Sequence, residues 1–367
     1  QETAPLSFER LAGIPFSLAV TLLVYFTFER FYRTWSQIRV GVCCGVLLSL
    51  TAALILSSPP INFAIHRADS VTEAAIAENE RIFVAPHENL VRETCVYSHF
   101  RNMSGPAYFG AYNDLERPFG LCTLPPGHGR LRFAAIGSSY MGDHLGMVAR
   151  QFVDFYSSFQ AFSQTACEVL SNTSRSDKCY NFVNYGDVLD DFEADVTFIL
   201  QRFYRPKLDA IPPEGSDDPV YDEMIKRYRQ IQNKSRLFYV LDVMPSMNHP
   251  VMEKLSEMIR KGFTEEQINN MTVRRNDIPY AKARMQRFAK ECGNCVVYDV
   301  VPALLDEHGQ YIAYDGKAKL ANIEFKSHLT PHGRQRVEPV YRKLAQRDAT
   351  RLRQLEREIY GNQLTQS

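Results

Sequence analysis

The stretch from Leu131 to Leu145, LRFAAIGSSYMGDHL, constrains the fold of this chain more than any other. Its first residues form a short apolar run that ends at Gly137 and is typical of a buried strand. Apolar side chains then recur at helical spacing from Met141 onward, as they do along one face of a helix. The stretch therefore predicts a strand, a tight turn carrying Ser138 and Ser139, and a helix.

This arrangement suits a nucleophilic serine. The turn lifts a hydroxyl out of the sheet edge, and the following helix N-terminus offers N–H groups without intrahelical partners and a positive dipole end. An oxyanion forming beside Ser139 would be stabilised there. The same pattern also fits an ordinary strand-to-helix turn whose serines cap the helix. It is not the G-x-S-x-G elbow, because Met141 occupies the place of the last glycine.

The rest of the chain places this stretch in an alternating pattern. From Arg130 onward, apolar runs alternate with helical stretches, which predicts an α/β fold with a parallel sheet and helices on both faces. Sites in such sheets lie at the carboxyl ends of strands, and Ser139 directly follows the first one. The predicted strands are 131–136, 159–165, 196–202, 237–243 and 296–300, and the predicted helices are 72–81, 143–155, 221–232, 250–261, 279–291 and 334–360.

Two uncharged apolar runs, 15–28 and 40–56, precede this domain. Each approaches the roughly 20 residues that cross a bilayer. The segment between them carries Arg30, Arg33 and Arg39, and basic residues beside a span favour the cytoplasmic face. We therefore expect two transmembrane helices in a multi-pass membrane protein, with the C-terminal domain lumenal or extracellular. The alternative is an apolar hairpin buried in a globular core.

Cysteines and glycosylation acceptors agree with that location. Six of the eight cysteines follow the second apolar run, an even set that favours three disulfides. Pairing by neighbour is the simplest of the fifteen possible connectivities, and Cys292–Cys295 also fits a redox pair or half of a metal site, although we expect no metal. The expected disulfides are Cys95–Cys122, Cys167–Cys179 and Cys292–Cys295, and the expected glycosylation sites are Asn102, Asn172, Asn233 and Asn270.

Charge and length narrow the functional classes. The 367 residues include 42 basic and 42 acidic side chains, so the formal net charge of zero gives no sign of a nucleic-acid partner. The length allows one large domain with additional segments. The first residues resemble the interior of a longer protein, so we expect the chain to be a fragment without its N-terminal portion.

His328 is the residue best placed to activate Ser139. It lies between the last strand and the last helix, where the chain returns toward the sheet edge. A serine nucleophile needs a base within hydrogen-bond distance, and the pKa of histidine suits that role at neutral pH. A surface or capping histidine is the ordinary alternative, which we expect of His332.

These motifs resemble those of the SGNH (GDSL-like) hydrolases. Gly137-Ser138-Ser139-Tyr140 after a strand resembles the Gly-Asp-Ser block, and His328-Leu329-Thr330 before the final helix resembles the Asp-x-x-His block. The resemblance implies a three-layer α/β/α, flavodoxin-like domain with Ser139 as nucleophile and His328 as base. Together with the apolar runs, the chain resembles the C-terminal part of an acyltransferase family 3 membrane protein with a fused SGNH domain.

The sequence departs from the family pattern at the acid of the triad. Phe325 stands three residues before His328, where the family has Asp. Glu324 or Asp315 would then have to orient the imidazole; without either, the site is a Ser–His dyad or is inactive.

The groups that stabilise an oxyanion also depart from the pattern. Ser138 replaces the usual Asp. Arg202 ends a strand that resembles the group's strand ending in Arg, and it stands where other SGNH enzymes use an Asn donor. The expected oxyanion or substrate-binding groups are therefore Ser138, Gly186 and Arg202.

The resemblance implies transfer of an acyl group, acetyl being expected, to a hydroxyl of a carbohydrate or lipid. It implies acyl-CoA as the donor for the membrane domain and no bound cofactor. An esterase and a catalytically inactive lumenal binding module are the alternatives. The expected organisation is the end of a membrane domain (1–58), a linker and entry region (59–129), an SGNH-like domain (130–340) and a charged C-terminal helix (341–367).

Overall fold

A computed structural model of the chain describes residues 70–84, 96–98, 120–164, 167–171, 184–203, 209–213, 216–274, 278–324 and 326–361, together with positions 46 and 49. The chain divides into two compact units, Gln1–Val71 and Thr72–Ser367. Apart from positions 46 and 49, the predicted spans lie outside the described residues. None of the described helices has the length and apolar character needed to cross a membrane.

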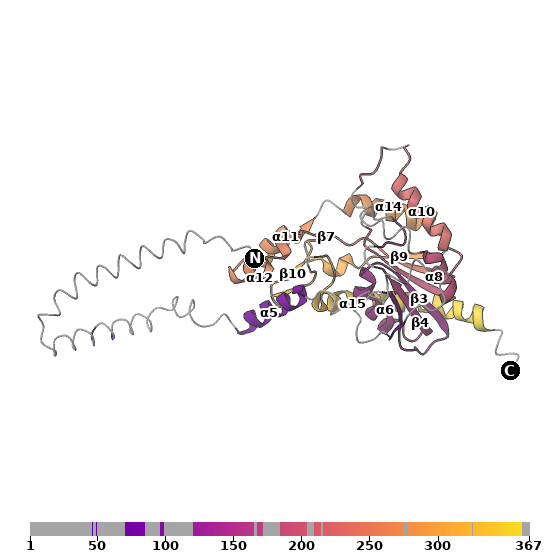
Figure 1. The fold of residues 1–367 in the computed structure, drawn as a ribbon, viewed down its shortest axis with the longest axis horizontal. Coiled ribbons are helices and arrows are strands. Elements are labelled where there is room, and N and C mark those ends of the chain that lie inside the picture. The colour runs from indigo at the N-terminus through magenta and orange to yellow at the C-terminus, as the bar shows by residue number, and fades with distance from the viewer. Residues whose placement is uncertain are drawn as a thin grey trace, which may run out of the picture. The chain divides into compact units, whose positions relative to one another are not determined.

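A seven-stranded sheet forms the centre of the second unit (Figure 1). The five central strands run parallel, and two strands at one edge pair antiparallel. This antiparallel edge was not predicted. In spatial order the strands are β1 (Val96–Ser98), β2 (Gly120–Thr123), β4 (Tyr156–Ser163), β3 (Leu131–Gly137), β5 (Val196–Leu200), β6 (Leu237–Leu241) and β9 (Cys295–Tyr298).

The strand order reverses at β3. The chain passes from β3 to β4 on one side and then returns to β5 on the other side of β3. In open α/β sheets, sites form outside the carboxyl ends of the strands at such a switch point. The Ser138 N–H donates to the Leu200 carbonyl oxygen at 3.1 Å, which joins the turn after β3 to the end of β5. The predicted turn therefore lies at the switch point.

Helices cover both faces of the sheet, as expected for a three-layer α/β fold. Successive side chains of a strand point to opposite faces. Phe133 and Phe198 accordingly lie in the core beneath two helices, and Ala134 and Ile199 lie in the other core beneath three. The first pair of helices is α6 (Tyr140–Gln151) and α15 (Pro331–Tyr360), and the other three are α8 (Tyr185–Phe192), α10 (Pro219–Ile231) and α14 (Ile278–Glu291).

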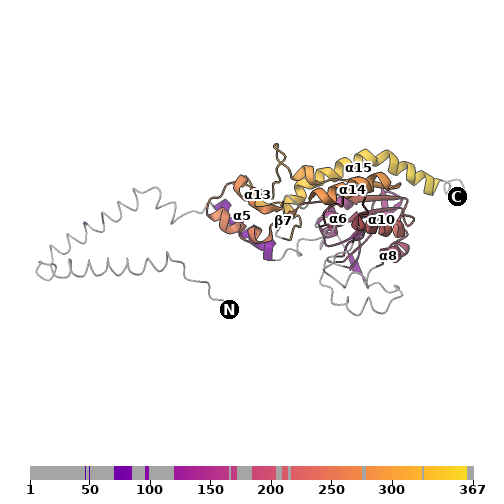
Figure 2. The same ribbon diagram turned by 90° about the horizontal axis from the view of Figure 1, so that it is seen from above.

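Helix α15 is continuous, so the expected separate segment at 341–367 is in fact part of this domain helix. Figure 2 shows α15 in yellow, running along the length of the unit. The helix begins at Pro331, which suits its first turn, and Thr330 caps it by accepting the Gly333 N–H at 3.1 Å. Buried side chains such as Leu344 and Leu352 fasten it to the sheet.

Smaller elements complete the unit. Helix α5 (Ser70–Val84) is attached through Asn79, whose amide donates to the Lys319 carbonyl and accepts the Ala321 N–H, both at 2.9 Å. The predicted helix at 250–261 is broken into two short helices. The remaining elements are β7 (Ser246–Met247), α11 (His249–Met252), α12 (Leu255–Arg260), α13 (Glu265–Thr272), β8 (Val273–Arg274), the 3-10 helix η3 (Val301–Leu304), β10 (Tyr314–Asp315) and β11 (Leu320–Ala321).

Candidate active site

Ser139 lies in the turn between β3 and α6, immediately before the first residue of the helix. The turn depends on Gly137, because a Cβ there would lie 1.9 Å from the Leu200 carbonyl oxygen. Ser139 is partly exposed, whereas Ser138 is buried and its Oγ lies 3.5 Å from the Tyr140 nitrogen. Of the two hydroxyls, Ser139 is therefore the one that faces outward at the switch point.

The segment that carries His328 packs against the start of α6. The Tyr140 hydroxyl donates to the Ser327 carbonyl oxygen at 2.7 Å, and the Tyr140 and His328 rings lie 5.0 Å apart between centroids. The structure thus brings the two predicted residues to the same edge of the sheet. Within the described part of the chain, no hydrogen bond joins the Ser139 hydroxyl to the imidazole. Catalytic hydrogen bonds often tighten only when substrate binds.

His328 is bonded through its ring to a carboxylate that the sequence analysis missed. Its Nδ1 lies 2.8 Å from Asp143 Oδ2, and both side chains are buried. Burial alone would lower the pKa of His328. The charge and hydrogen bond of Asp143, with the charge of Glu324, outweigh burial and the opposing charge of Arg202, so the pKa is raised above its usual value.

The two acids proposed from the sequence have other roles, so these expectations are wrong. Glu324 accepts backbone N–H groups from Lys326 at 2.8 Å and His328 at 2.9 Å, and it shapes the loop instead of orienting the ring. Burial raises the pKa of Glu324. Asp315 Oδ2 lies 3.1 Å from His332 Nε2, and its other oxygen caps the β10–β11 turn.

Asp143 was missed although the sequence carries a signal for it. It follows Ser139 by four residues, and residues four apart share one face of a helix. A charged residue on the apolar face of α6 therefore had to point toward the same edge as the nucleophile. Recognising it required knowing that the His328 loop covers that face.

Arg202 lies two residues beyond the end of β5 and reaches the His328 loop. Its Nη2 is 3.4 Å from Ser327 Oγ and 3.5 Å from Ser246 Oγ. Ser327 Oγ also accepts the Met247 N–H at 2.9 Å, and its backbone has a φ of 71°. The predicted Arg202 is thus part of the same rim as His328.

Gly186 does not join this rim through its N–H. That group donates to Asn184 Oδ1 at 3.0 Å and completes the cap of α8. The expectation that Gly186 supplies an oxyanion donor is wrong, because its donor is committed to the helix cap.

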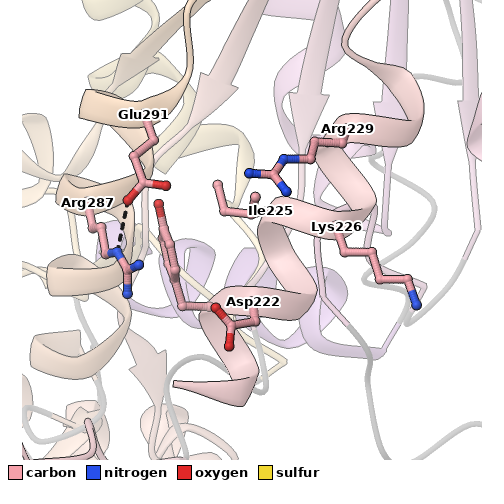
Figure 3. Close-up of a pocket in the computed structure, with 7 residues that line it drawn as sticks. Asp222, Ile225, Lys226, Arg229, Arg287 and Glu291 are labelled. Atoms are coloured by element: carbon pink, nitrogen blue, oxygen red, sulfur yellow. Dashed lines mark hydrogen bonds and ion pairs between the residues drawn. The ribbon is translucent and has the colours of Figure 1, made fainter. Parts of the chain in front are cut away.

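A separate groove opens on the α10 and α14 face, which lies on the side of the sheet opposite α6 (Figure 3). The Arg287 guanidinium stacks 3.8 Å above the Tyr221 ring and its Nε lies 2.9 Å from Glu291. The groove is therefore part of a surface ion-pair arrangement and not of the Ser139 site. Its lining consists of Tyr221, Asp222, Ile225, Lys226, Arg229, Arg287 and Glu291.

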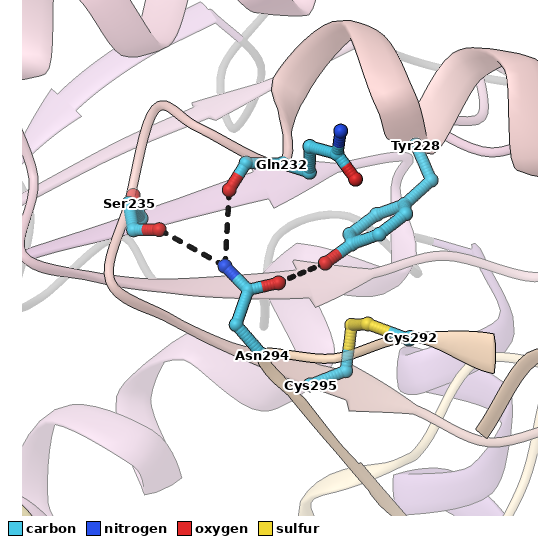
Figure 4. The surroundings of a disulfide bond; sticks show 6 residues. All are labelled: Tyr228, Gln232, Ser235, Cys292, Asn294 and Cys295. Carbon is cyan, nitrogen blue, oxygen red and sulfur yellow. Dashed lines mark hydrogen bonds between the residues drawn. A yellow bond between two sulfur atoms is a disulfide. The ribbon is translucent and has the colours of Figure 1, made fainter. Parts of the chain in front are cut away.

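The Cys292–Cys295 disulfide is confirmed (Figure 4). Both sulfurs are bonded, so this pair is not half of a metal site. The loop it closes presents Asn294, whose amide donates to the carbonyls of Gln232 at 3.0 Å and Ser235 at 3.2 Å. The disulfide loop thereby fastens the connection between α10 and β6.

The other predicted modifications are described in part. Cys122 and Cys167 each form a disulfide, while their predicted partners, Cys95 and Cys179, lie outside the described residues. Asn233 and Asn270 are exposed, as a glycosylation acceptor must be, and Asn102 and Asn172 fall outside the residues whose side chains can be placed. Across the part of the chain that is described, no three His, Cys, Asp or Glu side chains form a metal-binding group.

Three solved structures are similar to this chain. The periplasmic domain of a lipopolysaccharide acetyltransferase from Salmonella ser. Paratyphi A is 11% identical, with 61% of this chain and 84% of that chain covered and a TM-score of 0.40. For the C-terminal catalytic domain of a peptidoglycan O-acetyltransferase from Streptococcus pneumoniae, the values are 11%, 63%, 96% and 0.29. For a GDSL-like lipase from Bacteroides thetaiotaomicron they are 9%, 59%, 88% and 0.32.

No curated protein matches the chain. A family match spans residues 94–343, which is more than half of the 367 residues. It includes Ser139, Asp143 and His328. The chain therefore belongs to the family described as the SGNH domain fused to AT3 domains.

Proposed function

We propose that this SGNH domain transfers an acyl group through Ser139, with His328 as the general base. The observation that carries the proposal is the packing of the His328 loop against the helix that Ser139 precedes, through the Tyr140–Ser327 hydrogen bond and the Tyr140–His328 ring contact. Family membership supports the same roles. The raised pKa of His328 supports a ring able to hold a proton during the reaction.

The reaction has two balanced steps. In the first, His328 Nε2 removes the proton of Ser139 Oγ, Oγ bonds to the acyl carbon of the donor, and the departing group leaves with the proton from His328. In the second, an acceptor hydroxyl gives its proton to His328 and attacks the acyl-serine. Ser139 Oγ then leaves and regains the proton. The ester oxygen of the product comes from the acceptor, and no cofactor takes part.

Two groups of this chain stabilise the oxyanion. The Ser139 N–H lies at the start of α6, where backbone donors lack intrahelical partners and the helix dipole is positive. Arg202 supplies a cation from the neighbouring strand end. Such donors are effective because they are held in place before charge develops.

The acceptor is a hydroxyl of a carbohydrate or lipid outside the cell or in a lumen, and the acyl group is acetyl. The fusion to AT3 domains that defines the family supports a membrane part that takes acyl groups from acyl-CoA. The apolar runs at 15–28 and 40–56 are the transmembrane helices that end this part. Disulfides at Cys122, Cys167 and Cys292–Cys295 support the location, because disulfides persist in oxidising compartments.

Two alternatives remain distinct. An esterase has the same acyl-serine but passes the acyl group to water. An inactive binding module is favoured by the two departures from the family pattern, Ser138 and Phe325.

p-Nitrophenyl acetate distinguishes these functions. For a transferase we expect a burst of nitrophenolate, an acetyl group on Ser139, and faster turnover with a hydroxyl acceptor such as a soluble glycan. An esterase gives turnover that no acceptor accelerates. Absence of both burst and acetyl-Ser139 in the wild-type protein would contradict enzymatic function. Ser139→Ala is the negative control.

A further inference from the structure

We infer that Asp143 is the positioning acid of this site, orienting His328 from the helix that follows the nucleophile. The family places this acid three residues before the base, where this chain has Phe325. The inference rests on the proposed function, since a positioning acid has meaning only if His328 acts on Ser139.

The hydrogen bonds of Asp143 fix both the ring and the backbone of His328's segment. Oδ2 lies 2.8 Å from His328 Nδ1 and accepts the Leu329 N–H at 3.2 Å. A carboxylate at Nδ1 keeps the proton of the neutral ring on that nitrogen. Nε2 is then the acceptor nitrogen that a serine hydroxyl requires.

Helix geometry sets the distance between nucleophile and acid. Residues four apart on a helix have Cβ atoms about 5–6 Å apart on one face. An imidazole bonded to Asp143 through Nδ1 extends its Nε2 toward the turn that carries Ser139. One rigid element thus fixes two of the three groups, and only the base comes from a separate segment.

The surroundings of Asp143 give it more charge than folding requires. Its side chain is 0% exposed, and among the described residues its Oδ1 is buried without a hydrogen-bond partner. A buried carboxylate that is only partly compensated opposes folding. The groups that act on it are His328, Arg334 of α15 and the adjacent His144, with Glu324 beyond the imidazole. A role in orienting the base explains why a charge is kept there.

The test is Asp143→Asn in the full chain, measured by the rate at which a fluorophosphonate labels Ser139. We expect labelling at neutral pH to slow by about 10³-fold, because Asn permits the wrong tautomer of the imidazole. The pH at which labelling reaches half its maximum should also fall. Asp315→Asn, which removes the carboxylate beside His332, is the matched control and should label within about twofold of wild type.

A relocation variant separates positioning from structure. Adding Phe325→Asp to Asp143→Asn restores a carboxylate at the family's position, and we expect it to recover at least about tenfold of the lost rate. A purely structural role for Asp143 predicts no recovery. Wild-type labelling rate and pH profile in Asp143→Asn would overturn the inference while leaving the proposed function intact.

Nitrogen-15 NMR of His328 tests the inference without catalysis. In wild type and in Ser139→Ala we expect the neutral ring to carry its proton on Nδ1 and to titrate above its usual pKa. Asp143→Asn should remove both properties. If wild-type Ser139 is never labelled, the proposed function fails, and the NMR result still decides whether Asp143 orients the ring: an unchanged tautomer and pKa in Asp143→Asn overturn the inference.

Discussion

Two histidines are buried on the same side of the sheet, and they differ in what their rings contact. His328, at the rim, is bonded to the Asp143 carboxylate. His144, one residue after that acid, has its Nδ1 2.8 Å from the Tyr341 hydroxyl, which lies 3.3 Å from the hydroxyl of Tyr298. We call the first group the rim cluster (His328, Asp143, Tyr140) and the second the deep cluster (His144, Tyr341, Tyr298).

The two clusters titrate in opposite directions. Burial lowers the pKa of His144 to about 4, although the Asp143 charge acts in the other sense. In His328 the carboxylate outweighs burial, and the pKa is raised. The comparison teaches that burial alone keeps an imidazole neutral, whereas a directly bonded carboxylate makes it able to take up a proton. Only the rim cluster can therefore serve as a base near neutral pH.

The largest expected effect comes from exchanging the two rings for glutamine. His328→Gln removes the general base, so labelling of Ser139 by a fluorophosphonate should fall by about 10²–10⁴-fold. His144→Gln should leave the rate within about threefold of wild type, because that ring does not face the turn. Equal losses of rate in the two variants would break the distinction between the clusters.

The acid dependence of stability isolates the deep cluster. A pKa of about 4 in the folded protein, below the usual 6.5, favours the unfolded state as protons are taken up. Stability contributed by neutral His144 is thus lost as pH falls from about 6.5 to about 4, by about 3 kcal/mol in total. The check is the free energy of unfolding in urea at both pH values, compared with His144→Gln, which should lack this part of the loss. Parallel curves would contradict the expectation.

The rim cluster should show the opposite sign. The raised pKa of His328 gives stability that is complete below its unfolded value of about 6.5 and is lost as pH rises through the folded pKa. The labelling rate should rise over that same upper range, since only the neutral ring accepts a proton. A rate that reaches its plateau below about pH 6 would be incompatible with His328 as the base.

A matched pair of Tyr→Phe substitutions gives the smallest effects. Tyr341→Phe removes the partner of His144 Nδ1, so the unfolding free energy should drop by about 1–2 kcal/mol with labelling unchanged. Tyr140→Phe removes the hydroxyl that donates to Ser327, and labelling should slow by only a few-fold because the ring still packs on His328. Urea unfolding and labelling rates, measured on both variants, check the pair. Similar effects of both variants on rate would blur the comparison.

The sequence predicted those parts of the fold that depend on local pattern. The strand before Gly137 is apolar on both faces and is thus typical of a central strand, and the structure confirms it as β3. The edge strands β1 and β2 were missed, because they are short and lie in a segment rich in turn residues. Their pairing is set by tertiary context and not by a periodic pattern.

The site was predictable to the same limit. Ser139 and His328 follow from their places after a strand and before a helix. Asp143 could not be assigned, because its role depends on a loop 185 residues away that covers α6. Gly186 was misjudged because its N–H is taken by the Asn184 side chain, a contact that spacing alone does not reveal.

Mapping of a fluorophosphonate adduct by tandem mass spectrometry tests the central claim most directly. The claim is that His328 activates the outward hydroxyl of the turn after β3. It predicts that folded wild-type protein carries the adduct on Ser139, and that His328→Gln carries almost none after the same exposure. An adduct on the neighbouring Ser138, or none on the wild-type protein, would contradict it.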